Sequence, residues 1–287
     1  MENQIGTLEN SYYVHPSGLA FDFSNKSAIT FTLFIGAAVS IKPLKTYLDF
    51  YNKLFYHKLK KFVNVVIVAD RQPDTLMYTG NYRGISGLCD SVWQLGKLLN
   101  HIIYEKHHTE RTIVFGDCGG SLPAILTSTI VPYHSITFTT PYYEVLSNKN
   151  EFDVEQYSMW FARNHSIYIF DNLSEYKPYF DTIEYYDEYT KTPGNQLNLH
   201  WASNIIGTDL LFRHKANMLP KRSNLRIIDH LVPSDVEGHM LIKWLSSSGL
   251  YYSMILDEIK IQQAIIDTKR LPNATQSCVN INDSVPR

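Results

Sequence analysis

The residues with the clearest chemical potential are a cysteine and the glycines around it. Residues 112–120 read Thr-Ile-Val-Phe-Gly-Asp-Cys-Gly-Gly, and a helix-compatible segment follows from Ser121 to Thr129. An apolar strand that ends in such a turn before a helix is the pattern of a nucleophile elbow, with Cys118 in the position of the nucleophile. The flanking glycines leave room where a Cβ would collide with the turn. The positive end of the following helix favours the thiolate, so the pattern predicts an activated cysteine.

The C-terminal third of the chain supplies an acid and a base in the order that such a nucleophile needs. A predicted strand at 197–202 is followed by Asp209, and a predicted strand at 225–229 is followed by a loop that contains His239. In a Cys-His-Asp triad the histidine takes the thiol proton and the acid orients the imidazole. Asp171 and Asp235 are alternative acids. His230 is the rival base, although its place at a strand end favours a structural role.

The segments before the cysteine predict the framework that positions it. Residues 28–35 and 62–69 are apolar, β-branched runs that suit buried strands, and 135–139 forms a further strand after the cysteine. Apolar residues recur at helical spacing over 43–61 and 86–104. Strands that alternate with helices predict an α/β fold with a mainly parallel sheet.

Together, the Gly116–Gly120 elbow, Gly207-x-Asp209 and Gly238-His239 make residues 28–265 resemble the α/β-hydrolase superfamily. The order nucleophile, acid, histidine is the order of that superfamily. The resemblance implies an oxyanion hole formed by the backbone of Gly119 and by the loop at Gly36 and Ala37, after the family's third strand. It also implies that the aromatic and polar segment at 142–195 is a cap or lid insertion.

We therefore expect one α/β-hydrolase-like domain over residues 1–287. Tyr12–Val14 and Leu19–Phe23 predict an antiparallel hairpin at the edge of the sheet. Residues 271–287 are polar and without periodicity, which predicts a loose C-terminal tail.

Composition narrows the class of protein. The formal charge of −2 argues against a nucleic-acid partner, and no stretch reaches the roughly 18 apolar residues of a membrane span. The polar start lacks the apolar core of a signal peptide. With only three cysteines there is no disulfide framework, and Cys89 is expected to be a buried apolar residue while Cys278 is incidental. These features predict a cytoplasmic protein. No metal cluster or nucleotide-binding motif occurs, and cysteine chemistry requires no cofactor or metal.

The predicted function is acyl transfer through an acyl-thioester, as in an acyltransferase, a thioesterase or an esterase. A cysteine nucleophile favours transfer over hydrolysis, because thioesters react with amines and thiols more readily than with water. A small-molecule acyl substrate is expected, and carbohydrate or acyl-carrier-linked substrates both fit; the oligomeric state is open. Two alternatives are a non-catalytic binding or assembly subunit of the same fold and a chymotrypsin-like cysteine protease, whose histidine and acid precede the nucleophile. The long helices before Cys118 argue against the protease.

Overall fold

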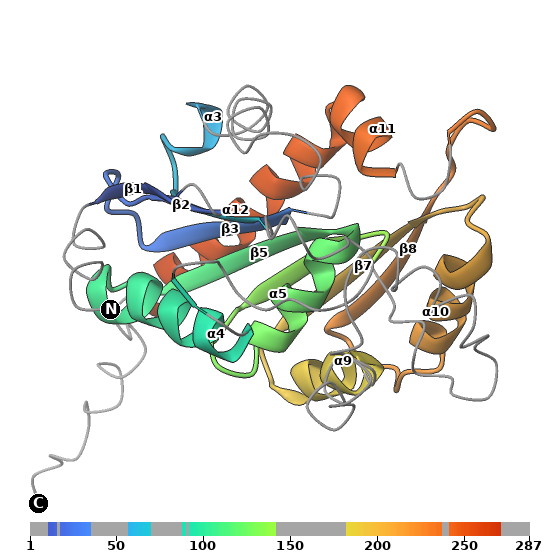
Figure 1. The fold of residues 1–287 in the computed structure, drawn as a ribbon, viewed down its shortest axis with the longest axis horizontal. Helices are drawn as coiled ribbons and strands as arrows, with labels where there is room; N and C mark the ends of the chain where they lie inside the picture. Colours follow the sequence, from blue (N-terminus) through green and yellow to red (C-terminus); the bar gives the residue numbers. More distant parts are fainter. Residues whose placement is uncertain are drawn as a thin grey trace, which may run out of the picture.

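An eight-stranded sheet forms the centre of the computed structural model, which describes residues 11–15, 18–35, 57–69, 88–89, 92–141, 182–236 and 241–270 (Figure 1). The strands are β1 (Tyr12–His15), β2 (Leu19–Asp22), β3 (Ile29–Ile35), β4 (Asn64–Ala69), β5 (Arg111–Asp117), β6 (Ser135–Thr139), β7 (Gln196–Ala202) and β8 (Leu225–His230). Their order across the sheet is β1-β2-β4-β3-β5-β6-β7-β8. β1 pairs antiparallel with β2, and β2 pairs antiparallel with β4, whereas β4, β3 and β5 to β8 pair in parallel with one another.

This topology confirms the predicted α/β fold and the N-terminal hairpin. Parallel strands all point the same way, so the ends of β5, β7 and β8 lie along one edge of the sheet. The protease alternative is wrong, because that class requires short antiparallel strands, and here the strand before Cys118 is paired in parallel on both sides.

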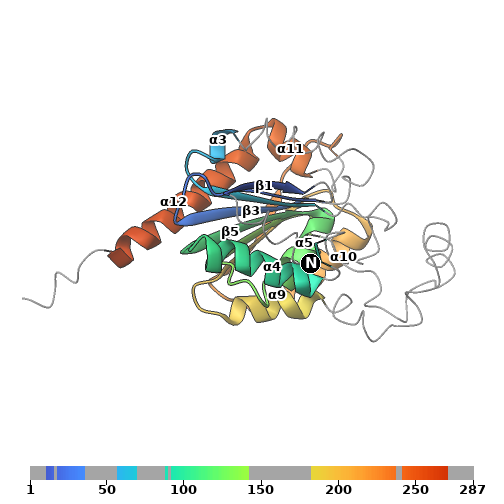
Figure 2. The ribbon, with the colours of Figure 1, turned by 60° about the vertical axis from the view of Figure 1, so that its left-hand side comes forward.

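Helices cover both faces of the sheet (Figure 2). They are α3 (His57–Leu59), α4 (Val92–Asn100) with its π-helical extension η4 (His101–Lys106), α5 (Ser121–Thr127), α9 (Thr182–Lys191), α10 (Gly207–Asn217), α11 (Leu241–Ser247) and α12 (Leu250–Arg270). α4, α5 and α9 lie on one side of the sheet, and α11 and α12 lie on the other. Among the described ranges, no helix combines the length and the apolar character needed to cross a bilayer.

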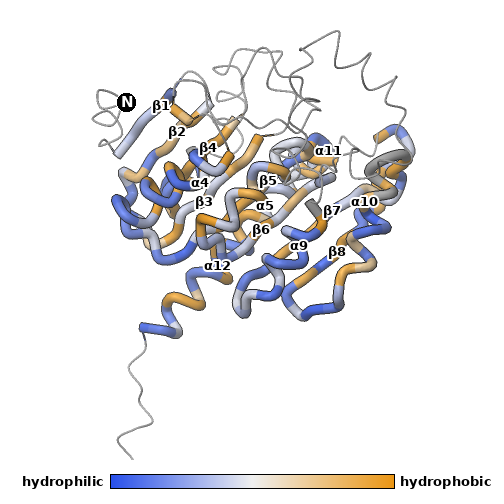
Figure 3. The backbone as a smooth tube through the Cα atoms, turned by 60° about the horizontal axis from the view of Figure 1, so that its bottom comes forward, coloured by the Kyte–Doolittle hydropathy of each residue, from blue (hydrophilic) through white to orange (hydrophobic). Residues whose placement is uncertain are grey.

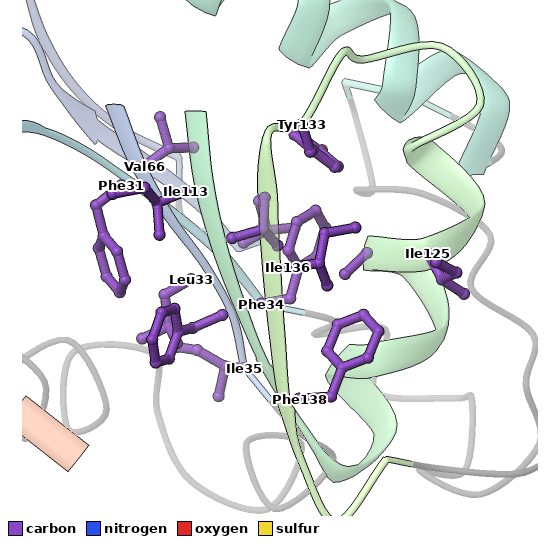
Figure 4. Close-up of a cluster of buried hydrophobic side chains, with 14 of the residues drawn as sticks. Phe31, Leu33, Phe34, Ile35, Val66, Ile113, Ile125, Tyr133, Ile136 and Phe138 are labelled. Carbon is purple, nitrogen blue, oxygen red and sulfur yellow. The ribbon is translucent and has the colours of Figure 1, made fainter. Parts of the chain in front are cut away.

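The core follows from the sequences of the central strands. β3, β4, β5 and β6 are buried along their whole length, as expected for parallel strands that are covered on both faces. Hydrophobic residues accordingly gather along the middle strands and in α5 (Figure 3). Alternate side chains of one strand enter the two layers: Phe31 meets Phe115, whereas Phe34 meets Tyr133 (Figure 4).

Several expected segments differ from the observed ones or lie outside the described residues. At the end of the segment expected to form a cap, 142–195, α9 lies on the sheet, where Tyr186 is buried against Phe138. Residues 142–181 and the tail at 271–287 lie outside the described residues, so a cap within the former stays a prediction. Of the helix predicted at 43–61, only α3 falls within the described ranges.

Candidate active site

Cys118 occupies a strained turn between β5 and α5. Its φ is +46°, a left-handed value that is uncommon for a residue with a side chain, whereas Asp117 directly before it is still extended. Cys118 begins a short 3-10 turn that leads into α5, and its side chain is only partly buried. Backbone strain of this kind persists where the surrounding structure enforces it. The predicted strand-turn-helix placement of Cys118 is therefore present.

Two glycines make this turn possible by close approach. A Cβ on Gly120 would lie 2.3 Å from the carbonyl oxygen of Phe34, and a Cβ on Gly116 would lie 2.8 Å from the ring of Phe138. Ser121 is buried and donates its hydroxyl hydrogen to the carbonyl oxygen of Cys118 at 2.7 Å. The turn is thus fitted against β3 and β6, and the glycines at 116 and 120 are the ones that this packing requires.

Asp117 places a buried carboxyl group beside the nucleophile in the chain. It is the last residue of β5, with 9% of its surface exposed, and its Oδ1 accepts a hydrogen bond from Thr139 Oγ1 at 3.0 Å. Burial raises the pKa of Asp117 to about 7, while the Thr139 hydrogen bond acts in the opposite direction. Asp117 can therefore change charge near neutral pH.

The ends of β7 and β8 leave the same edge of the sheet, one and two strands beyond β6. Asp209 was expected in a loop after β7, but it lies in the first turn of α10, which begins at Gly207. The segment that follows Ala202 is short, and the helix starts earlier than the motif suggested. Asp209 nevertheless follows β7 in the order required of a triad acid.

Polar contacts join these two strand ends. His200 Nδ1 and His230 Nε2 are 2.8 Å apart in a hydrogen bond, and the two rings are stacked. Burial lowers the pKa of His200 to about 3 and also lowers the pKa of His230. Further out, Asn204 Nδ2 donates to the carbonyl oxygen of Val236 at 2.5 Å. His230 thus has a structural partner, in line with the role expected of it.

Some of the remaining predicted site residues lie outside the part of the chain that the structure describes. His239, Gly36 and Ala37 lie outside the described residues, as does the alternative acid Asp171, so their arrangement around Cys118 stays a prediction. Gly119 lies in the 3-10 turn directly after Cys118.

Two other expectations fall within the described ranges. The alternative acid Asp235 is exposed in the segment after β8, and Cys89 is buried as expected. In the part of the chain that the structure describes, no three His, Cys, Asp or Glu side chains gather as a metal site.

At the edge of the sheet where β5, β7 and β8 end, the sequence did not predict a role for four residues, which are Asp117, Thr139, His200 and Asn204. A signal did exist for Asp117 and His200: a charged or titratable residue within a buried apolar strand is rare enough to indicate a special role. Thr139 and Asn204 carry no such signal, because threonine is common in strands and asparagine is common in loops.

Comparison with solved structures relates this architecture to known folds. An esterase of Pyrococcus furiosus matches with a TM-score of 0.50 and 13% identity, over 89% of this chain and 93% of that one. The capsule O-acetyltransferase of Neisseria meningitidis serogroup A matches with a TM-score of 0.51 and 13% identity, over 86% of this chain and 94% of that one. No protein-family model matches the sequence, and no curated protein matches it.

The strand order, the helices on both faces and these similarities define the class of fold. The chain adopts the α/β-hydrolase fold, with Cys118 in the turn after the central strand β5. At this level of identity the similarity establishes the fold and not the reaction.

Proposed function

We propose that this protein is an acyl-transfer enzyme, an acyltransferase, thioesterase or esterase, with Cys118 as its nucleophile. The observation that carries the proposal is the left-handed turn at Cys118, which the close contact of Gly120 with β3 enforces. A strained turn with a partly exposed cysteine suits nucleophilic attack, and backbone strain of this kind clusters at active sites. The similar folds of an esterase and an O-acetyltransferase support the same class of reaction.

In the proposed mechanism, His239 removes the thiol proton of Cys118 and Asp209 orients the imidazole. The thiolate sulfur attacks the carbonyl carbon of an ester or thioester, and the carbonyl oxygen gains a negative charge. Backbone N–H groups of Gly119 and of the Gly36–Ala37 segment are proposed to stabilise this oxyanion. Its collapse expels the alcohol or thiol, which takes the proton from His239, and leaves an acyl-thioester on Cys118.

The second half of the reaction repeats this chemistry with an acceptor. A hydroxyl, amine or thiol loses its proton to His239 and attacks the thioester carbonyl, and the Cys118 thiolate leaves. Water in place of the acceptor gives hydrolysis. The proposed substrates are small acyl donors, with carbohydrate or carrier-linked acceptors among the candidates. The proposed location is the cytoplasm, where reducing conditions keep Cys89 and Cys118 as thiols.

The proposal is tested with p-nitrophenyl acetate as the acyl donor. We expect release of nitrophenol and the gain of one acetyl group per protein after acid quenching. Peptide mass mapping should locate this acetyl group on Cys118. Cys118→Ala should abolish both signals, Cys118→Ser should retain the fold but react slowly, and His239→Ala should lower the rate by about 10² to 10⁴. Cys89→Ala is the matched control, since Cys89 is a buried thiol.

Asp209→Asn tests the acid, and a rate lowered by orders of magnitude is expected if Asp209 orients the imidazole. If neither Cys118→Ala nor His239→Ala changes the rate and no acetyl group is found on Cys118, the enzyme proposal is wrong. A non-catalytic binding subunit then takes its place.

A further inference from the structure

The carboxyl group of Asp117 lies in a row of polar residues that crosses the end of the sheet. Asp117, Thr139 and His200 are register partners on β5, β6 and β7, so their side chains share one face. This is the α12 face, because Phe115, two residues before Asp117, meets Tyr251 of α12. The row thus begins at the residue bonded directly to Cys118.

The surroundings of Asp117 leave its charge largely uncompensated. Burial and the Thr139 hydrogen bond account for its pKa, and no charged group among the described residues contributes. On the side of β3, the neighbour of this row is the apolar and buried Ile35. On the side of β6 and β7, Thr139 stands before His200, which burial keeps neutral at neutral pH.

Among the residues that the structure describes, α11 and α12 on this face contribute no charge that shifts the Asp117 pKa. Tyr251 of α12 is fully buried, and Glu258 of α12 is hydrogen-bonded to Gln262, which in turn binds Arg111 at the opposite end of β5. Lys243 of α11 is exposed. His230 is hydrogen-bonded to His200. The one titratable group joined to Asp117 along the chain is therefore the thiol of Cys118.

We infer that Asp117 is a positioning residue that tunes the nucleophile: its buried carboxylate and the Cys118 thiolate compete for one negative charge at the end of β5. This inference rests on the proposed function for its catalytic consequence. At low pH the carboxyl group is neutral and does not oppose the thiolate. As the pH rises and Asp117 ionises, its charge disfavours a second negative charge on the adjacent residue. The nucleophile is thereby held back at alkaline pH relative to an isolated thiol in the same turn.

The test is the pH dependence of Cys118 alkylation by iodoacetamide, in which the thiolate displaces iodide. It is followed by mass mapping of Cys118 in the full-length protein. We expect a profile with two ionisations for the wild type. Asp117→Asn should give a single ionisation at lower pH, with alkylation at about pH 8, where the wild-type carboxyl group is ionised, faster by roughly tenfold, the effect of one nearby like charge. The amide can still accept the Thr139 hydrogen bond.

A second variant and a control make the outcome specific. Thr139→Val removes the hydrogen bond that favours ionised Asp117, so the upper step of the profile should move to higher pH. This variant also serves if Asp117→Asn fails to fold. Asp22→Asn alters another buried carboxyl group, on β2, and should leave the profile unchanged. The inference is overturned if the Asp117→Asn profile matches the wild type, or if Asp22→Asn shifts it equally.

Alkylation requires no acyl-transfer activity, so the two proposals fail separately. A protein with no esterase or transferase activity but with the expected Asp117→Asn shift would overturn the proposed function and support the tuning of the thiol. Acetylation of Cys118 together with unchanged alkylation profiles would support the proposed function and overturn the tuning of the thiol by Asp117.

Discussion

The conformation of the turn after β5 is fixed by close contacts with neighbouring backbone, whereas the segments after β7 and β8 are held by side-chain hydrogen bonds. Gly120 has room for no side chain beside the Phe34 carbonyl oxygen. By contrast, the β7 and β8 ends are joined by the His200–His230 pair and by the Asn204 hydrogen bond to Val236. A steric fit leaves one backbone conformation, while a polar contact can be replaced by another or by water.

The difference has a consequence for how each region responds to change. In the turn, one added methyl group meets the backbone of a neighbouring strand. At the β7 and β8 ends, loss of one hydrogen bond leaves the strands and their pairing intact. We therefore expect added side-chain volume in the turn to act mainly on folding, and loss of the Asn204 hydrogen bond at the β7 and β8 ends to act mainly on reactivity.

The largest effect is expected for Gly120→Ala. The new Cβ would lie 2.3 Å from the Phe34 carbonyl oxygen, so β3 and the turn must separate. We expect the free energy of unfolding to fall by about 4 kcal/mol, in the range of severe overpacking, and Cys118 alkylation to slow. Urea unfolding followed by circular dichroism measures the first effect.

Gly249→Ala is the matched control for the added methyl group. Gly249 has a φ of +78°, and among the described residues no atom beyond its neighbours in the chain lies within 4 Å of the place that the alanine methyl group would take, so only backbone strain of about 1 kcal/mol is expected. Equal losses in the two variants would contradict a steric origin for the turn.

Asp117→Asn should stabilise the protein at alkaline pH. The folded state raises the pKa of Asp117 from 3.8 to about 7. At a pH where Asp117 is protonated in both the folded and the unfolded protein, it does not change the free energy of unfolding. As the pH rises from about 4, Asp117 lowers the free energy of unfolding, and the full loss is reached above about pH 7. We expect a gain on the order of 3 kcal/mol at about pH 8 and none at about pH 4, measured by urea unfolding. A uniform gain at both pH values would show that charge is not the cause.

The β7 and β8 ends should show the opposite pH dependence. His200 is neutral in the folded state down to a pKa of about 3, while the unfolded chain binds a proton near the ordinary value of 6.5. Stability from this group is present above the unfolded pKa and is lost as the pH falls. We expect His200→Gln to remove about 2 kcal/mol of the wild-type loss between about pH 7 and pH 5.

The control for His200→Gln is His214→Gln, which replaces an exposed histidine on α10 by the same residue. If His200→Gln changes the slope of stability against pH no more than His214→Gln does, burial of His200 is not the source of the pH dependence.

The same contrast explains what the sequence could and could not predict. The alternation of strands and helices, the hairpin and the Cys118 turn follow from local patterns, because apolar runs and glycine spacing act over a few neighbouring residues. The Asp117–Thr139 contact joins residues that are distant along the chain and depends on the register of β5 and β6. The position of Asp209 in α10 depends on where a helix starts, which a Gly-x-Asp pattern does not fix.

The smallest change in stability, and the sharpest test of the comparison, is expected for Asn204→Ala. Asn204 binds the carbonyl oxygen of Val236, which precedes the proposed base His239 by three residues. Asn224, at the opposite end of β8, likewise joins two segments through hydrogen bonds to the carbonyl oxygens of Thr190 and Asn195. Asn204 donates one hydrogen bond to a backbone oxygen and Asn224 donates two, so we expect a loss of about 1 kcal/mol of stability in Asn204→Ala and about 2 kcal/mol in Asn224→Ala.

Only the Asn204 hydrogen bond lies at the edge of the sheet where Cys118 stands. Without it, the chain that leads to His239 loses a contact with the segment after β7, and a small displacement of a catalytic base is enough to slow proton transfer. We expect kcat/KM for p-nitrophenyl acetate to fall about tenfold in Asn204→Ala and to stay within twofold in Asn224→Ala. Equal rates in the two variants would mean that the hydrogen bond to Val236 supports the fold and not the position of the base.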